Sequence, residues 1–409
     1  MRHDPARLSF TIDARDGSAR TGSLRTAHGS VATPAFIPLA TQGTVRALSV
    51  RDVAAIGFEL ILGNTFHLHL MPGDERIGEL GGLHEFMGWD GAIVTDSGGF
   101  QVFSLSHGGV ADEIKGRRRP PQGRGRIVSI KERGVRFRSY VDGSEKFMGP
   151  EESMGIQARL SSDIALVFDE CTPFHADRDY TARSTERTHR WLDRCLDWHG
   201  EHGPATQAVY GIVQGGIHED LRAESSEAIA AAGVDGIAIG GTLGRDKPEM
   251  HGVVAMTVPM LPESAPKHLL GIGEPDDLLA GIAAGIDVFD CAVPTRLARH
   301  GMALAPLPDS RHRFDIRRAR FALDRGPLVE GCECEACRGH TRAYLHYLAR
   351  QNEPTGMRLM TIHNLTYLER LVRGAREAIA AQRFGEYRAA IESGAAPWEA
   401  RAMIGAEAA

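Results

Sequence analysis

Long apolar segments are absent from this 409-residue sequence. No run reaches about 18 apolar residues, the length that a membrane-spanning helix requires. The first 19 residues, MRHDPARLSFTIDARDGSA, lack the apolar stretch of a secretory signal. We therefore expect a cytoplasmic protein without a membrane partner, whose cysteines are held in a reducing compartment.

An excess of positive charge is also lacking. Lysine and arginine number 47 against 53 aspartates and glutamates, and the formal net charge is −6. This balance excludes a protein that is basic over its whole surface, but it leaves room for a local basic patch. Residues 115–138 contain ten Lys and Arg residues and one acidic residue, Glu132. Two interpretations stay open for this segment, and for its first part at about 115–127 in particular: a solvated loop, or a contact surface for nucleic-acid phosphates.

Neither internal repeats nor a G-x-G-x-x-G motif after the first expected strand are found. Eight short apolar segments alternate with segments of helical character, at 35–40, 58–63, 92–95, 163–168, 207–213, 236–240, 268–273 and 286–290. This alternation predicts a parallel sheet, and eight such units close naturally into a (β/α)8 barrel. An open doubly wound sheet is the alternative, although the missing glycine motif disfavours its dinucleotide-binding form.

Polar residues and glycines follow these apolar segments where each expected strand ends. Asp96, Asp169 and Asp290 lie at three strand ends, Gln214 at another and Gly241 at a further one. In a barrel all of these ends share one face, which carries the chemistry. An aspartate after a strand is more often a turn or cap residue, but the joint pattern favours a pocket.

The six cysteines include a tight cluster, C-x-C-x-x-C, at Cys332, Cys334 and Cys337. Three thiolates this close predict a structural zinc site, which needs a fourth ligand. His340, His346 and His363 all follow the cluster, and spacing alone does not choose among them. We accordingly divide the chain into a barrel catalytic region (1–309), a zinc-binding subdomain (310–365) and a helical extension packed on the barrel (366–409).

Two carboxylates that face one sugar carbon support a double displacement. One attacks C1′, while the other protonates the leaving group and later deprotonates the incoming one, so that configuration is retained. Three aspartates are available at the strand ends, and the sequence does not show which pair lies close together.

Six separated motifs occur in the order of a known family: DSGGFQVFSL (96–105), FDECTP (168–173), GIVQGG (211–216), HLLGIGEPDDLL (268–279), FDCAVPTRLARHG (289–301) and CECEAC (332–337) followed by MTIHN (360–364). Together they resemble the bacterial tRNA-guanine transglycosylase (queuine tRNA-ribosyltransferase) family from about residue 8 to 385. The resemblance implies a (β/α)8 barrel with a zinc subdomain, and a pentosyltransferase that needs no organic cofactor. It also implies exchange of the wobble guanine of GUN-anticodon tRNAs (Asp, Asn, His and Tyr) for a 7-deazaguanine base, in queuosine biosynthesis, by a homodimer.

The resemblance also implies roles for individual residues. Asp290 would be the nucleophile on ribose C1′, and Asp96 the general acid/base. The base would be bound along its edges and on its faces by Asp169, Gln214, the backbone at Gly241, Phe100 and Leu270. Arg296 and Arg299 would contact the uridines that flank the target guanosine. One structural zinc ion per chain would be held by Cys332, Cys334, Cys337 and His363.

One loop departs from the family pattern. After Gly241 the sequence reads GGTLGRDK, where many members have GGLAVGE, so it is one residue shorter and offers Arg245 and Asp246. The choice among 7-aminomethyl-7-deazaguanine (preQ1), queuine and guanine is therefore open.

Three other functions are weighed against this one. An archaeal-type transglycosylase usually carries further C-terminal RNA-binding domains, which we do not expect here. A non-catalytic partner subunit lacks the aspartate pair, whereas this sequence has both Asp96 and Asp290. A metal-dependent barrel hydrolase needs histidines at several strand ends, and the expected strand ends supply no such pair.

Overall fold

Eight parallel strands form a closed barrel, as the alternation of apolar segments predicts. The computed structural model describes residues 7–104, 127–172, 176–241 and 244–405. The barrel strands follow one another in chain order: β4 (Ala35–Ala40), β5 (Leu60–Gly63), β6 (Ala92–Thr95), β10 (Ile164–Leu166), β11 (Ala208–Val213), β12 (Gly236–Ile239), β13 (Lys267–Leu269) and β14 (Val288–Cys291). The pairing of β14 with β4 closes the ring, with Val288 opposite Ala35. The predicted fold class is confirmed, and the open doubly wound alternative is excluded.

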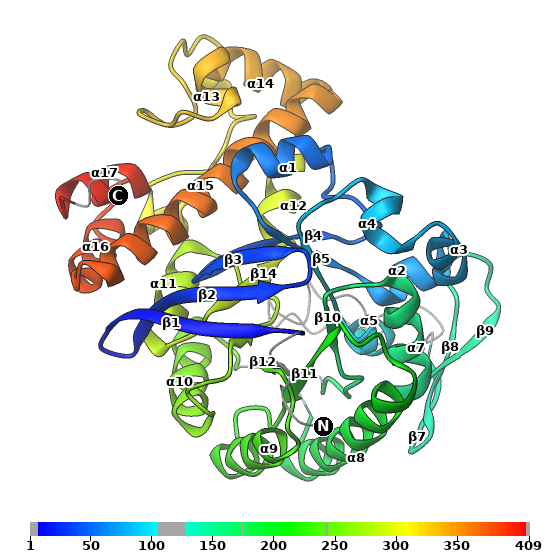
Figure 1. Cartoon of the computed structure of the whole chain (residues 1–409). Coiled ribbons are helices and arrows are strands. Elements are labelled where there is room, and N and C mark those ends of the chain that lie inside the picture. The colour runs from blue at the N-terminus through cyan, green and yellow to red at the C-terminus, as the bar shows by residue number, and fades with distance from the viewer. Residues whose placement is uncertain (1–6, 105–126, 173–175, 242–243, 406–409) are drawn as a thin grey trace.

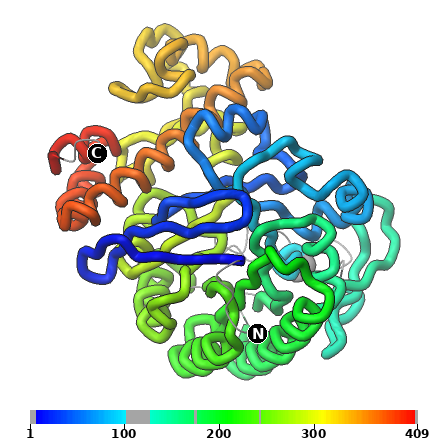
Figure 2. Tube along the Cα trace, viewed as in Figure 1, coloured from blue at the N-terminus to red at the C-terminus, as the bar shows by residue number. Residues whose placement is uncertain are grey.

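The strands are almost continuously apolar because side chains on both of their faces are buried. Helices connect them around the outside (Figures 1 and 2). These helices are α1 (Val50–Ile56), α2 (Thr65–Leu70), α3 (Asp74–Glu79), α4 (Gly82–Met87), α5 (Gly99–Ser104), α7 (Pro150–Leu160), α8 (Arg178–His202), α9 (Glu219–Ala231), α10 (Lys247–Thr257), α11 (Pro275–Ala284) and α12 (Val293–Arg299). Side-chain caps fix several starts: Asp177 accepts from Tyr180 N at the start of α8 and Asp246 from Glu249 N at the start of α10.

An antiparallel sheet that the sequence analysis did not predict covers the N-terminal end of the barrel. It consists of β1 (Ser9–Asp16), β2 (Ala19–Thr26) and β3 (Gly29–Thr33). Arg20 of β2 is buried and bonds both carboxylate oxygens of Asp287, just before β14, at 2.8 and 2.5 Å. This face is therefore closed, and the opposite face, at the C-terminal strand ends, is left for the chemistry.

Part of the basic segment is an ordered sheet rather than a loop. The strands β7 (Ile127–Lys131), β8 (Gly134–Arg138) and β9 (Glu145–Met148) pair antiparallel. Glu132, in the turn between β7 and β8, accepts two hydrogen bonds from Arg190 of α8 at 2.7 and 2.9 Å, and its carbonyl accepts one from Trp191 Nε1. The one acidic residue of the segment thus docks the hairpin on α8, and the loop interpretation is wrong for 127–138. Residues 115–126 lie outside the described residues.

The C-terminal part is built around a 27-residue helix, α15 (Pro354–Ala380). It packs against α12 and β4 of the barrel. Around it lie β15 (Met302–Leu304), β16 (Arg313–Asp315), the short 3-10 helices η2 (Pro308–Ser310) and η3 (Ala319–Phe321), α13 (Glu335–Gly339), α14 (Arg342–Gln351), α16 (Phe384–Glu392) and α17 (Pro397–Met403). Because α15 runs through residue 365, the subdomain at 310–365 and the extension at 366–409 share one helix. Among the described residues, no helix is long and apolar enough to cross a membrane.

Candidate active site and metal centre

The polar residues predicted at strand ends do lie at the C-terminal rim of the barrel. Asp96 follows β6 directly, Asp169 lies just beyond β10, Gln214 follows β11, and Asp290 belongs to β14. The negative charges of Asp290 and Asp169 both act on the Asp96 carboxyl group. The three carboxyl groups therefore lie close enough to interact electrostatically.

Asp96 is held by the start of α2. Thr65 N donates to Asp96 Oδ1 at 2.9 Å, and Asn64 Nδ2 donates to Oδ2. Burial raises the pKa of Asp96 to about 7, and the charges of Asp290 and Asp169 add to that rise, although backbone N–H groups oppose it. A carboxyl group with this pKa exchanges a proton near neutrality, as a general acid/base must.

Asp290 is held through one of its two oxygens. His268 Nε2 lies 3.0 Å from Oδ1, and Gly271 N donates to the same atom at 3.1 Å. No hydrogen bond from the described part of the chain reaches Oδ2, so this is the carboxylate oxygen left open to a ligand. His268 is a candidate site residue that the sequence analysis did not single out. It is buried within β13, and only the strand register, with His268 opposite Val288, brings it to Asp290.

Asp169 and Gln214 form a second polar group. Ser97 Oγ donates to Asp169 Oδ1 at 2.8 Å, and Gln214 Nε2 donates to Oδ2 at 2.7 Å. Burial raises the pKa of Asp169 to about 6, with the charge of Glu170 adding to the rise. Gln214 Oε1 is buried without a hydrogen-bond partner among the described residues. A buried acceptor of this kind is costly unless a ligand satisfies it. Ser97 was not singled out from the sequence.

Gly241 lies directly against this group. Its φ of +77° favours glycine, and a Cβ there would come within 2.4 Å of Gln214 Oε1. Leu270 lies beside Gly240 and the Gln214 amide. Phe100, at the start of α5, has 39% of its surface exposed, which leaves an aromatic ring free to stack.

Arginine side chains gather beside β14. Arg296 is exposed on α12, and Arg299 is partly buried on the same helix. Burial lowers the pKa of Arg299, and the positive charges of Arg46 and Arg296 lower it further, so the three guanidinium groups are neighbours. Among the described residues none of them has an acidic partner within salt-bridge distance. Arg46, from the loop between β4 and α1, was missed because only the fold brings it here.

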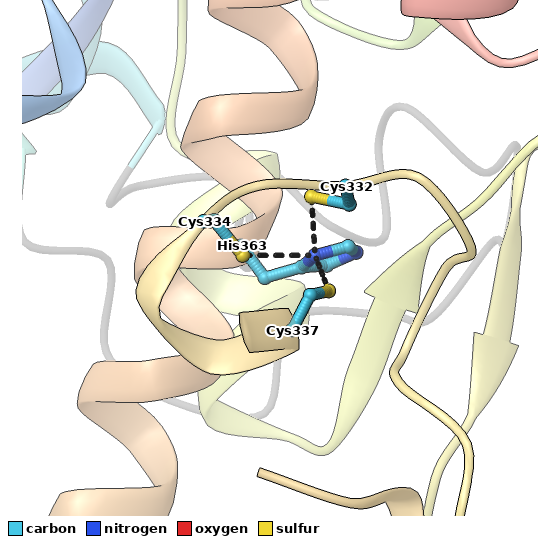
Figure 3. A group of neighbouring side chains, drawn as sticks. All are labelled: Cys332, Cys334, Cys337 and His363. Atoms are coloured by element: carbon cyan, nitrogen blue, oxygen red, sulfur yellow. Dashed lines mark hydrogen bonds between the residues drawn. The ribbon is translucent and has the colours of Figure 1, made fainter. Parts of the chain in front are cut away.

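The four predicted zinc ligands converge, although they come from two separate segments. Cys332, Cys334 and Cys337 lie in and before α13, and His363 lies on α15; all are buried. Their thiols and the imidazole point toward one another (Figure 3), with His363 Nδ1 at 3.8, 3.6 and 3.3 Å from the three sulfurs. Bond lengths of about 2.3 Å to sulfur and 2.0 Å to nitrogen in a tetrahedron put the donors about 3.6 Å apart. The spacing therefore fits a four-coordinate metal ion.

The protonation of His363 also fits. Its Nε2 lies 2.8 Å from the carbonyl oxygen of Leu304 and donates to it, which leaves Nδ1 as the acceptor that faces the sulfurs. Of the other two candidates, His346 is bonded to the Ile316 carbonyl and His340 contacts Tyr344. Neither belongs to the cluster.

Comparisons with known proteins agree with this geometry. The model of a family described as queuine tRNA-ribosyltransferase matches residues 15–395. A queuine tRNA-ribosyltransferase of Roseiflexus sp. (strain RS-1) is 49% identical over 393 residues, covering 93% of this chain and 98% of the relative. The proteins of the same name from Solidesulfovibrio magneticus and Oleidesulfovibrio alaskensis are 47% and 49% identical, over 94% and 93% of this chain and 97% and 94% of their own lengths.

Proposed function

This chain belongs to the queuine tRNA-ribosyltransferase family and is a tRNA-guanine transglycosylase, and from that premise we propose that it exchanges the base by double displacement. Asp290 attacks C1′ of the guanosine ribose, and the bond from C1′ to the base breaks. The ribose of the tRNA is then held as an ester of Asp290 until a new base reverses the step.

The two aspartates take different parts in this exchange. Asp290 attacks through Oδ2, because His268 and the Gly271 N–H hold Oδ1. Asp96 protonates the departing guanine and later takes a proton from the incoming base. The observation that carries the proposal is the electrostatic interaction between the two aspartates. The negative charge of Asp290 helps to raise the pKa of Asp96 to about 7. Two attacks on one carbon retain its configuration.

The base is bound by the second polar group. The Asp169 carboxylate and the unpartnered Gln214 Oε1 are acceptors, which suit the N–H groups of a guanine edge. The Gly241 backbone supplies a further contact, and Phe100 and Leu270 cover the faces of the ring. A base that fills this pocket excludes water, so the ester waits for another base and is not hydrolysed.

The tRNA is bound beside the pocket. Arg296 and Arg299 contact the uridines that flank the target, and Arg46 adds a third cation to the same surface. We assign the substrates as the GUN-anticodon tRNAs for Asp, Asn, His and Tyr. The incoming base is a 7-deazaguanine, preQ1 or queuine. The loop after Gly241 should decide between these two bases. At its end, Asp246 caps α10 and the Arg245 N–H donates to Glu249.

The metal is zinc, which Cys332, Cys334, Cys337 and His363 would hold. Since all four ligands come from the protein, the bound ion would crosslink the segment 332–337 to α15 and leave no position for a substrate. Its part is therefore structural, within the region 310–365.

A homodimer is supported by exposed apolar side chains near this region. Leu323 is 91% exposed, Tyr347 57% and Tyr344 43%. Leu323 follows η3, which packs against α14, and α14 carries both tyrosines. Apolar side chains gathered at a surface are typical of a protein interface.

The first test is incorporation of radiolabelled guanine into a GUN-anticodon tRNA, followed by competition with unlabelled preQ1 and queuine. The wild-type protein should incorporate label and form a covalent tRNA adduct that survives denaturation. Asp290→Asn should form none, while its zinc content and tRNA affinity stay unchanged. Label entering the tRNA with Asp290→Asn at the wild-type rate would refute the nucleophile assignment. Absence of incorporation by the folded, zinc-loaded wild type would favour a non-catalytic partner subunit.

A further inference from the structure

One buried arginine outside the groups described so far connects the two strand ends that carry the base-binding residues. Arg222 lies on α9 and is fully buried. Its three guanidinium nitrogens donate to the carbonyls of Gly216 at 2.8 Å, Val213 at 3.1 Å and Gly240 at 3.1 Å. All three acceptors are backbone oxygens at the C-terminal ends of β11 and β12 or in the turn between β11 and α9.

These carbonyls belong to the peptide groups that set the direction of Gln214 and Gly241. The Val213 carbonyl precedes Gln214, whose own N–H donates to Ser225 Oγ at 3.0 Å. The Gly240 carbonyl precedes Gly241. Because a peptide unit is planar and trans, a fixed carbonyl makes the following N–H point the opposite way. Among the described residues the Gly241 N–H has no hydrogen-bond acceptor, and the fixed Gly240 carbonyl turns it away from Arg222.

We infer that Arg222 is a positioning residue for base recognition. By bonding the Val213 and Gly240 carbonyls, it fixes the peptide groups that lead into Gln214 and Gly241. Gln214 Oε1 and the Gly241 N–H are thereby held in place together for the base. This inference rests on the proposed function. Burial lowers the pKa of Arg222 to about 10, so the group is still charged at neutral pH. A planar guanidinium has the fork of donors that three separate carbonyls require, which lysine lacks.

The test separates base binding from tRNA binding. In the exchange assay, Arg222→Met should raise the KM for guanine about tenfold, which corresponds to about 1.4 kcal/mol for one weakened hydrogen bond. The KM for tRNA should change by less than about twofold, because the arginines beside β14 are untouched. Arg222→Lys should fall between wild type and Arg222→Met, since one ammonium group reaches fewer of the carbonyls.

A matched control is Arg376→Met. Arg376 is a partly buried arginine that also donates to a backbone carbonyl, that of Pro34, at the opposite end of the barrel. Its loss should lower stability and leave the KM for guanine unchanged. An unchanged KM for guanine in Arg222→Met, or equal rises in both variants, would overturn the inference. If Arg222→Met does not fold, a wild-type KM for guanine in Arg222→Lys overturns it instead. A wild-type protein that exchanges no guanine contradicts the proposed function itself, and the inference with it.

Discussion

Replacing Asp96 by asparagine should abolish turnover and, at alkaline pH, make the protein more stable. In the folded protein burial and the neighbouring aspartates raise the pKa of Asp96 to about 7, against an ordinary value of 3.8. The folded state therefore binds the proton more tightly than the unfolded state does. This contribution to stability is fully present below about pH 4 and is lost as the pH rises to about 7.

The size of this effect follows from the pKa difference. About three units correspond to about 4 kcal/mol at most, and we expect about 2 to 4 kcal/mol because solvent reaches the partly exposed carboxylate. The asparagine side chain has no charge to bury, so the variant should gain this amount over wild type at pH 8 and none of it below pH 4. The titrating groups that do not interact with Asp96 are common to both proteins and cancel in the comparison, whereas Asp290 and Asp169 are coupled to it.

The assay is urea denaturation of the zinc-loaded wild type and Asp96→Asn at several pH values from 4 to 8, with Asp13→Asn on the exposed edge of β1 as the matched control. The stability difference for Asp96→Asn should grow with pH, and by more than the difference measured for the control. A difference for Asp96→Asn that is the same at pH 5 and pH 8 would refute the pKa argument. Wild-type turnover in the same variant would remove Asp96 from the acid/base role.

Three further predictions concern the metal, the RNA and the nucleophile. Cys334→Ser should reduce the zinc content and lower stability. The control Cys195→Ser, at a buried thiol remote from the cluster, should keep the zinc. Metal analysis of the purified variants measures both zinc contents. Arg46→Ala should weaken tRNA binding and reduce the slope of log K against log salt by about 0.7 to 0.9. Arg388→Ala on α16 is the control. An unchanged slope in Arg46→Ala would show that Arg46 does not contact the RNA. His268→Phe should slow adduct formation about tenfold at unchanged tRNA affinity. His268→Gln, which keeps a donor, should slow it less. If rapid-quench assays give wild type and His268→Phe the same rate, His268 does not position Asp290.

The barrel was predictable because its strands are buried on both faces. Such strands are continuous apolar runs, and these runs can be counted in a sequence. The sheet β1–β3 was not found because its strands have one exposed face and carry charged residues: β1 reads SFTIDARD. The β7–β8 hairpin was missed for the same reason, since the arginines that suggest a loop lie on its exposed positions. Strands of this kind are stabilised by the surface they cover, which the local sequence does not contain.

The candidate site divides along a similar line. Asp96, Asp169 and Gln214 were found because each follows an apolar run, and a parallel barrel gathers strand ends on one face. His268 and Arg46 were not found. His268 meets Asp290 only through the register of β13 with β14. Arg46, in the loop between β4 and α1, comes near Arg299 only in the folded chain. Residues that act on a neighbouring strand or helix leave no signal at fixed spacing in the chain.

The metal cluster and the helix that carries Arg296 and Arg299 are connected by two adjacent residues of α15. His363 faces the thiols and donates to the Leu304 carbonyl. The next residue, Asn364, is fully buried, accepts a hydrogen bond from Leu304 N at 2.8 Å and donates to the carbonyls of Pro294 and Met302 at 3.0 Å. Pro294 lies in α12, so the helix that holds the metal ligand also holds the helix that carries the two arginines.

Through this connection, a bound metal ion that touches no substrate can still affect the position of α12. A metal that fixes His363 also fixes Asn364 one residue away, and through it the position of Arg296 and Arg299. Asp290 is different, because its carboxylate is held by His268 and Gly271 of the barrel itself. Loss of the ion should therefore weaken tRNA binding before it displaces the proposed nucleophile, Asp290. On the proposed function, the metal cluster supports the helix whose arginines bind tRNA, whereas the barrel itself holds the nucleophile.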